Sequence, residues 1–216
     1  MGEAARRAQN TYAGSILLKP ILIQTTPHTG THTCMYLYRY LGGIPAFFMH
    51  FGDWELSAFL SEFHDFRERF IFVHTMRPLY DIVATYKKRT PEYADDPGHP
   101  NSAENLVRRN LAVEAEWKAE FSEAIIQPLG IDAGLQTGMA RQIFKACDVE
   151  VPAIAKRFLE TWPPKGTFPT GAKGDLKGFG TEDEYQQMSR FMNDLRIMPG
   201  KEWRDKVNLA LKELSN

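Results

Sequence analysis

The chain has 216 residues, of which 43% are hydrophobic and 25% are charged, so it can bury the full core of a globular domain. The net charge of −1 argues against a protein that binds nucleic acid or an anionic membrane over its whole surface, and any anion site must be local. No apolar run approaches the ~20 residues that span a bilayer, and Cys34 and Cys147 have neither metal-ligand nor disulfide-framework spacing. We therefore expect one cytoplasmic domain over residues 1–216, with reduced thiols.

The first part of the chain alternates between strand and helix patterns. Short apolar runs bounded by turn residues predict buried parallel strands at 20–24, 45–51 and 70–75. Helical spacing predicts helices after each of them, at 31–41, 54–68 and 79–89. This order predicts an α/β fold, with a central parallel sheet between two layers of helices. Ligands of such sheets bind beyond the carboxyl ends of the strands.

The remainder of the chain is predicted to be mainly helical. Residues 91–101 are rich in proline and acidic side chains and should form an exposed loop. Two further loops are expected at 128–138 and 162–180, because both stretches contain several glycines. Thr181 and Glu184 form a capping-box pattern. Helices are predicted at 104–126, 138–147, 152–161, 181–198 and 201–214.

The segment TTPHTGTHT lies between the first strand and its helix, which is the position of a phosphate-binding loop. Gly30 would let the backbone turn and approach a ligand, and the first amides of the helix would stabilise an anion. Thr29, Thr31 and Thr33 would add hydroxyl donors. The segment lacks the lysine of the GxxxxGK[ST] pattern, which disfavours a nucleotide triphosphatase. A helix start capped by threonine is the alternative interpretation.

The hexapeptide PHTGTH at 27–32 resembles the 5'-phosphosulfate loop of P-loop-like sulfotransferases, usually PKSGTT or PRSGTT. The proline, the hydroxyl residue, the glycine and the next threonine match. His28 replaces the basic residue, whose role it could take as an imidazolium, and His32 replaces the second threonine. The resemblance implies a P-loop-like three-layer fold and 3'-phosphoadenosine 5'-phosphosulfate as the co-substrate. The residues implied in binding it are Thr26, His28, Thr29, Gly30, Thr31, His32 and Thr33.

A second motif follows the third predicted strand. Arg77 and Thr85 are eight residues apart, the spacing of the arginine and serine that bind the 3'-phosphate in the same family. Asp81 and Tyr86 also match common family positions. A guanidinium can donate two hydrogen bonds to one phosphate, and Thr85 lies two helical turns further on nearly the same face. A surface arginine followed by a helical threonine is the alternative interpretation.

A third motif lies at 169–178, where PTGAKGDLKG is similar to the nucleotide-covering loop RKGxxGDWKN of the cytosolic branch. The resemblance implies that residues 162–180 cover the nucleotide. The Arg-Lys pair of the family is replaced by Pro169 and Thr170, and Lys173 could supply the missing charge. A flexible loop rich in glycine and lysine is the alternative. The residues implied in binding are Gly171, Lys173, Gly174 and Lys177.

In sulfuryl transfer, the hydroxyl or amine that receives the group must lose its proton to a base. The family often uses a histidine just past its second strand, and His50 occupies a comparable place, which makes it the candidate base. A structural histidine among aromatic residues is the alternative. Asp53 and Glu55 are the fallback candidates, because the carbohydrate branch uses a glutamate in this region. The lysine expected two places earlier is Phe48 in this chain.

Together these patterns predict a sulfotransferase that moves a sulfuryl group to a hydroxyl or amine of a small molecule or carbohydrate. Two alternatives remain: a small-molecule P-loop kinase, and a nucleotide- or partner-binding protein with the same fold and no transfer activity. No metal is expected, because the donor brings its own charge to Arg77 and the loop amides. Nucleic acid and membrane partners are not expected, and the sequence leaves the oligomeric state and the acceptor open.

Overall fold

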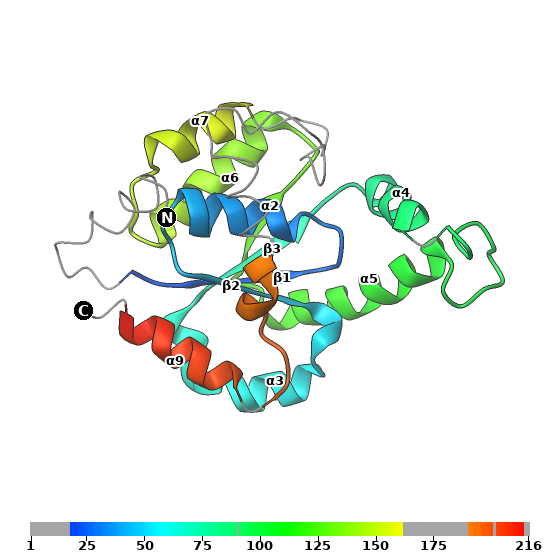
Figure 1. Ribbon diagram of the computed structural model, residues 1–216, viewed down its shortest axis with the longest axis horizontal. Helices are drawn as coiled ribbons and strands as arrows, with labels where there is room; N and C mark the ends of the chain where they lie inside the picture. Colours follow the sequence, from blue (N-terminus) through cyan, green and yellow to red (C-terminus); the bar gives the residue numbers. More distant parts are fainter. Residues whose placement is uncertain (1–17, 90, 162–189, 201, 214–216) are drawn as a thin grey trace.

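The computed structural model describes residues 18–89, 91–161, 190–200 and 202–213, which form a sheet covered by helices on both faces (Figure 1). The sheet of this part of the chain has four strands in the order β2-β1-β3-β4, and every neighbouring pair is parallel. The predicted three-layer α/β class is therefore confirmed. The strands are β1 (Ile21–Thr25), β2 (Ala46–His50), β3 (Ile71–Met76) and β4 (Ile125–Pro128).

The central strand β1 is buried along its whole length between β2 and β3. Successive side chains of a strand point to opposite faces of the sheet. Ile21 and Ile23 accordingly join the core on one face, whereas Leu22 joins the core on the other. Both faces of β1 need apolar cover, which explains why the segment reads as a continuous apolar run rather than an alternating one.

Among the described residues, helices α2 (Thr31–Met35), α6 (Ala133–Ala146) and α7 (Ala153–Thr161) cover one face of the sheet (Figure 1). The first continues as a π-helical turn, η1 (Tyr36–Leu41), which packs against the third. Tyr38 of this turn is fully buried, and its hydroxyl donates to Oε1 of Gln127 at 2.5 Å.

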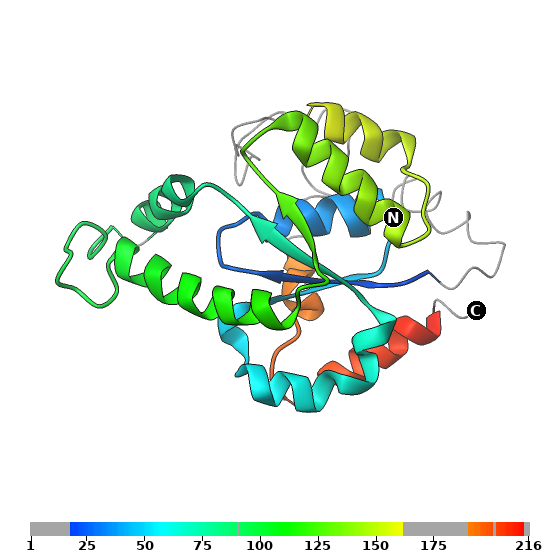
Figure 2. The same cartoon turned by 180° about the vertical axis from the view of Figure 1, so that it is seen from behind.

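The opposite face is covered by a second set of helices (Figure 2), and the core between them and the sheet is rich in aromatic residues. The ring of Phe59 lies 4.7 Å from that of Phe63 and 5.0 Å from that of Trp117. Each such pair contributes roughly 0.5–1.5 kcal/mol beyond the area it buries, so this layer fixes the helices firmly on the sheet. The helical segments are α3 (Leu56–Phe63), η3 (His64–Arg69), α5 (Ala103–Glu120) and α9 (Trp203–Glu213).

Two shorter segments and one helix complete the described fold. The helix α4 (Leu79–Arg89) packs against α5 beyond the carboxyl ends of the strands (Figure 1). The 3-10 turns η2 (Phe51–Asp53) and η4 (Met192–Leu195) both adjoin β2. Residue Arg196 forms an isolated parallel bridge with Phe48, beside β2. Among the described residues, no helix is both long and apolar enough to cross a membrane.

The structure differs from the prediction in the second half. The helix predicted at 104–126 ends at Glu120, and residues 125–128 form the strand β4, which the sequence did not predict. The helix predicted at 54–68 is α3 followed by the 3-10 segment η3, and the helix predicted at 138–147 begins at Ala133. Of the helix predicted at 181–198, residues 181–189 lie outside the described part, and 192–195 are a 3-10 turn.

Candidate functional site

The loop between β1 and α2 makes a tight left-handed turn. Gly30 has a φ of 102° and His28 a φ of 70°, and no side chain caps the helix that starts at Thr31. Such a turn brings successive amide N–H groups together, and the first amides of a helix have no acceptor within the helix. The φ of Gly30 is one that other residues rarely adopt, and a Cβ there would also force the Cδ1 methyl of Leu129 to move. The predicted turn is confirmed, but the close approach is to Leu129.

The threonine hydroxyls of the loop point inward. The Thr29 hydroxyl donates to the carbonyl oxygen of Thr26 at 2.6 Å and lies 2.6 Å from the hydroxyl of Thr25. Thr25 also receives a hydrogen bond from Thr75 on β3 at 2.7 Å and lies 3.1 Å from the hydroxyl of Thr31. These threonines are almost completely buried. The Thr29 hydroxyl is therefore engaged within the loop, and the role of Thr31 as a donor to a ligand stays a prediction.

A buried carboxylate on α5 contacts the start of the same loop. The hydroxyl of Thr26 donates to Oε2 of Glu114, and Lys118 pairs with Oε1 one helical turn further on. Only 8% of Glu114 is exposed, which is unusual for a glutamate. The sequence analysis did not single out this residue. Its signal was the spacing, because Glu114 falls on the buried face of α5 with Val107 and Trp117.

Arg77 joins the loop to α4. Its Nη1 donates to the carbonyl oxygen of His28 at 3.1 Å and lies 3.5 Å from the hydroxyl of Thr85. Its Nε lies 3.7 Å from the carboxylate of Asp81. The loop, the arginine and the predicted hydroxyl therefore meet at one place. The Thr85 hydroxyl itself donates to the Asp81 carbonyl at 2.8 Å.

Arginine and histidine side chains surround the loop. Burial lowers the pKa of His28 to about 4, and the charges of Arg89, His50, Arg77 and His32 lower it further in the same direction. Burial and then Arg89 likewise lower the pKa of His32. This shift favours the neutral form of His28 at pH 7 in the free protein, and the imidazolium expected beside a bound donor stays a prediction. The ring of His28 packs edge-on against Tyr86 at 4.5 Å, which accounts for part of that burial.

His50 ends β2 directly beside Thr25 of β1. Burial lowers its pKa to about 4, the carboxylate of Asp53 opposes this shift, and Arg196 and His32 add to it. Nδ1 of His50 lies 3.2 Å from Nη2 of Arg196, and the same guanidinium forms a two-pronged pair with Asp53. The fallback base Asp53 is therefore engaged with Arg196.

The remaining predicted residues fall into three groups. The other fallback base, Glu55, is exposed at the start of α3. Thr33 is buried within α2, and His32 is half-buried beside it. The covering-loop residues lie outside the described part of the chain, so their placement remains a prediction: Gly171, Lys173, Gly174 and Lys177.

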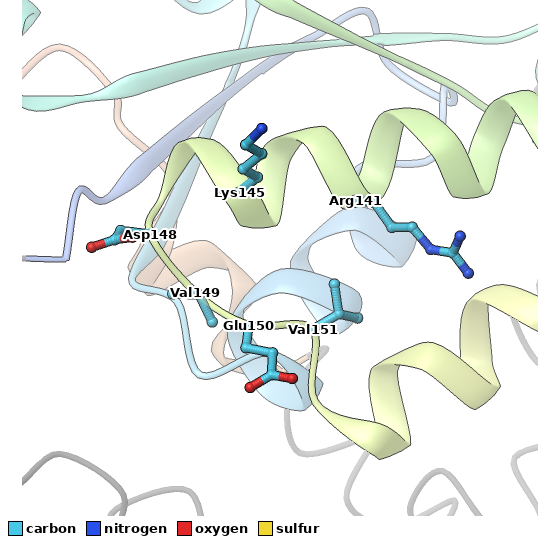
Figure 3. Close-up of a pocket in the computed structure, with 6 residues that line it drawn as sticks. All are labelled: Arg141, Lys145, Asp148, Val149, Glu150 and Val151. Carbon is cyan, nitrogen blue, oxygen red and sulfur yellow. The ribbon is translucent and has the colours of Figure 1, made fainter.

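An open cavity of about 450 Å³ lies elsewhere, where α6 ends (Figure 3). Because α6 starts after the carboxyl end of β4 and runs back along the sheet, its end is at the opposite edge from the loop. Two cationic and two acidic side chains share this cavity, so its charges largely cancel. Its lining residues are Arg141, Lys145, Asp148, Val149, Glu150 and Val151.

Both cysteines are buried and unbonded, and in the described ranges no three His, Cys, Asp or Glu side chains are grouped to hold a metal ion.

Comparison with known proteins gives no match: neither a family model, nor a curated protein, nor a solved structure is significantly similar to this chain.

Proposed function

We propose that the protein is a sulfotransferase with a P-loop-like fold that uses 3'-phosphoadenosine 5'-phosphosulfate. One observation carries the proposal: the guanidinium of Arg77 contacts both the carbonyl of His28 in the loop and the hydroxyl of Thr85 on α4. In this arrangement one ligand can meet the loop amides with its phosphosulfate end and Arg77 with its 3'-phosphate. A guanidinium is well suited to that role, because it binds a phosphate through two parallel hydrogen bonds.

The charge at this edge of the sheet supports an anionic ligand. The chain has a net charge of −1. Three arginines nevertheless lie close to the imidazoles at this edge, which are His28, His32 and His50. These arginines are Arg77, Arg89 and Arg196. Fixed amides and guanidinium groups stabilise the charge that develops on a departing phosphate without having to reorganise. A bound phosphate would also favour the protonated form of His28, and the imidazolium would then face the leaving oxygen.

The transfer itself requires one bond exchange and one proton acceptor. The acceptor oxygen or nitrogen bonds to sulfur, the bond from sulfur to the bridging oxygen breaks, and its electrons remain on the 5'-phosphate. We assign the acceptor proton to the carboxylate of Glu114, and this revises the assignment of His50 as base. Thr26 and Lys118 each donate to the Glu114 carboxylate. Because a carboxylate offers about four lone-pair positions, Glu114 can still accept a proton.

A nucleotide-binding protein without transfer activity is the second candidate. The neutral state of His28 and the inward hydroxyls of Thr29 and Thr31 favour it, because both remove donors that the family motif supplies to the donor nucleotide. A small-molecule kinase is less favoured, because the loop has no lysine for the β- and γ-phosphates.

Titration of the purified protein with 3'-phosphoadenosine 5'-phosphate and with ATP distinguishes these possibilities. We expect the bisphosphate to bind much more tightly than ATP, and sulfuryl transfer to 2-naphthol or to another member of an acceptor panel. Tighter binding of ATP would favour the kinase. Tight binding of the bisphosphate without transfer to any acceptor would favour the second candidate, and no binding of either nucleotide would refute the proposal.

A further inference from the structure

The side chain of His50 is held on two sides. In the turn η2, the backbone N–H of Asp53 donates to the His50 side chain, while the His50 backbone N–H donates to Oδ2 of Asp53 at 2.7 Å. This reciprocal pair fixes where the ring lies relative to the end of β2. The ring therefore has a defined orientation at the edge of the sheet before any ligand binds.

Arg196 supplies the second hold from a distant part of the sequence. Ile197 donates its N–H to the carbonyl of Phe48 at 2.8 Å, and Trp54 donates its ring N–H to the carbonyl of Ile197 at 3.2 Å. These bonds fasten the segment along β2. They place Nη2 of Arg196 at 3.2 Å from Nδ1 of His50, with Nε of the same group at 2.9 Å from Oδ2 of Asp53.

The contact with Arg196 indicates which ring nitrogen carries the hydrogen. A guanidinium has only donors, so Nδ1 of His50 must accept from Arg196. A neutral imidazole has one N–H, and with Nδ1 as acceptor that hydrogen lies on Nε2. A ring in this state offers a donor at Nε2 and has no free lone pair with which to take a proton.

We propose that Asp53 and Arg196 are positioning residues that hold His50 as an Nε2–H donor, directed at an oxygen of the bound anion. The identity of that oxygen, on the transferred sulfuryl group, rests on the proposed function, whereas the position of the hydrogen does not. His50 keeps its proton throughout the transfer. This role fits the revised assignment in which Glu114 takes the acceptor proton.

The position of the hydrogen can be measured directly on the full chain with ¹⁵N-labelled imidazoles. Two-bond ¹H–¹⁵N spectra at pH 7.5 should give His50 a pyridine-like Nδ1 and a pyrrole-like Nε2. Asp53→Asn and Arg196→Gln should shift both nitrogens toward averaged values. Arg204→Gln is the matched control, since it breaks a distant pair with Asp65 at 2.8 Å and should leave His50 unchanged. A pyrrole-like Nδ1 in the unaltered protein would overturn the proposal even if a variant failed to fold.

The donor role is tested by comparing His50→Gln with His50→Ala in sulfuryl transfer to 2-naphthol. A glutamine amide can donate from nearly the same position as Nε2 but cannot act as a base at neutral pH. We expect His50→Ala to lose ~12-fold to ~140-fold in turnover, the loss of one hydrogen bond to a charged group, and His50→Gln to recover most of it. Equal losses in both variants would refute the donor role. If the unaltered protein transfers nothing, the proposed function fails, and the spectra still decide the position of the hydrogen.

Discussion

Replacement of Arg77 by alanine gives the most direct test of the anion site. The guanidinium contacts the His28 carbonyl and the Thr85 hydroxyl, and only 17% of its side chain is exposed, so a phosphate bound to it would be shielded from water. A hydrogen bond to a charged group contributes about 1.5–3 kcal/mol. Arg77→Ala should therefore weaken binding of 3'-phosphoadenosine 5'-phosphate by ~12-fold to ~140-fold. Arg77→Lys should weaken binding less, because it keeps the charge and loses only the two-pronged geometry.

Isothermal titration calorimetry with a matched control makes this prediction decisive. Arg141→Ala removes the same charge from the cavity at the opposite edge of the sheet and should leave the affinity unchanged. Thermal unfolding of each variant separates a lost ligand contact from a loosened loop, since Arg77 also bonds to the loop in the free protein. An unchanged affinity in Arg77→Ala would refute the site. A loss confined to Arg141→Ala would move the anion to the cavity of Figure 3.

Three further outcomes are expected. Gly30→Ala should lower the free energy of unfolding in urea by about 1–3 kcal/mol, because its φ of 102° is strained for alanine; unaltered stability would contradict the turn. Glu114→Gln should reduce turnover with 2-naphthol by roughly 100-fold or more and leave the affinity for the bisphosphate unchanged. Glu116 is exposed on the same helix, and Glu116→Gln should change neither quantity. Full turnover in Glu114→Gln would show that Glu114 is not the base. Burial, followed by the charge of Lys118, lowers the pKa of His74 from 6.5 to about 4. As the pH falls, His74 of the unfolded chain is therefore protonated before His74 of the folded protein. The contribution to the free energy of unfolding that is present above pH 6.5 should be lost as the pH falls toward 4. Urea unfolding measures the free energy of unfolding at pH 7 and at pH 4. Between these two pH values it should fall by roughly 3 kcal/mol less in His74→Gln than in the unaltered protein. An equal fall in both proteins would count against the shifted pKa.

The sequence predicted the first three strands because each is a short apolar run closed by turn residues. It missed β4 because Ile125 and Ile126 continue the apolar spacing of the preceding helix and only four residues form the strand. Pairing in register with Val73 and His74 of β3 decides the conformation of these two isoleucines. That pairing is a contact between distant segments, which local periodicity does not contain.

The candidate site was predicted where spacing along the chain decides it. Arg77 lies just before α4 and Thr85 about two turns further along, so the short stretch of chain between them largely fixes their separation in space. Arg196 and Glu114 were missed because their partners are 143 and 88 residues away. The inward direction of the Thr29 hydroxyl was likewise unpredictable, because it depends on Thr25 and Thr75 from two neighbouring strands.

The inward threonines and the neutral imidazoles have a common physical consequence. The threonines hold the loop in the left-handed turn that assembles its amides, so fixed backbone dipoles and guanidinium groups would bind the proposed anion without a cost of reorganisation. The lowered pKa values of His28, His32 and His50 favour neutral imidazoles, which add no positive charge to that of the nearby arginines. An anion in contact with the imidazoles raises their affinity for protons, so binding and proton uptake must be linked. In the proposed complex, the positive charge at this edge would therefore increase only when the anion is present to compensate it.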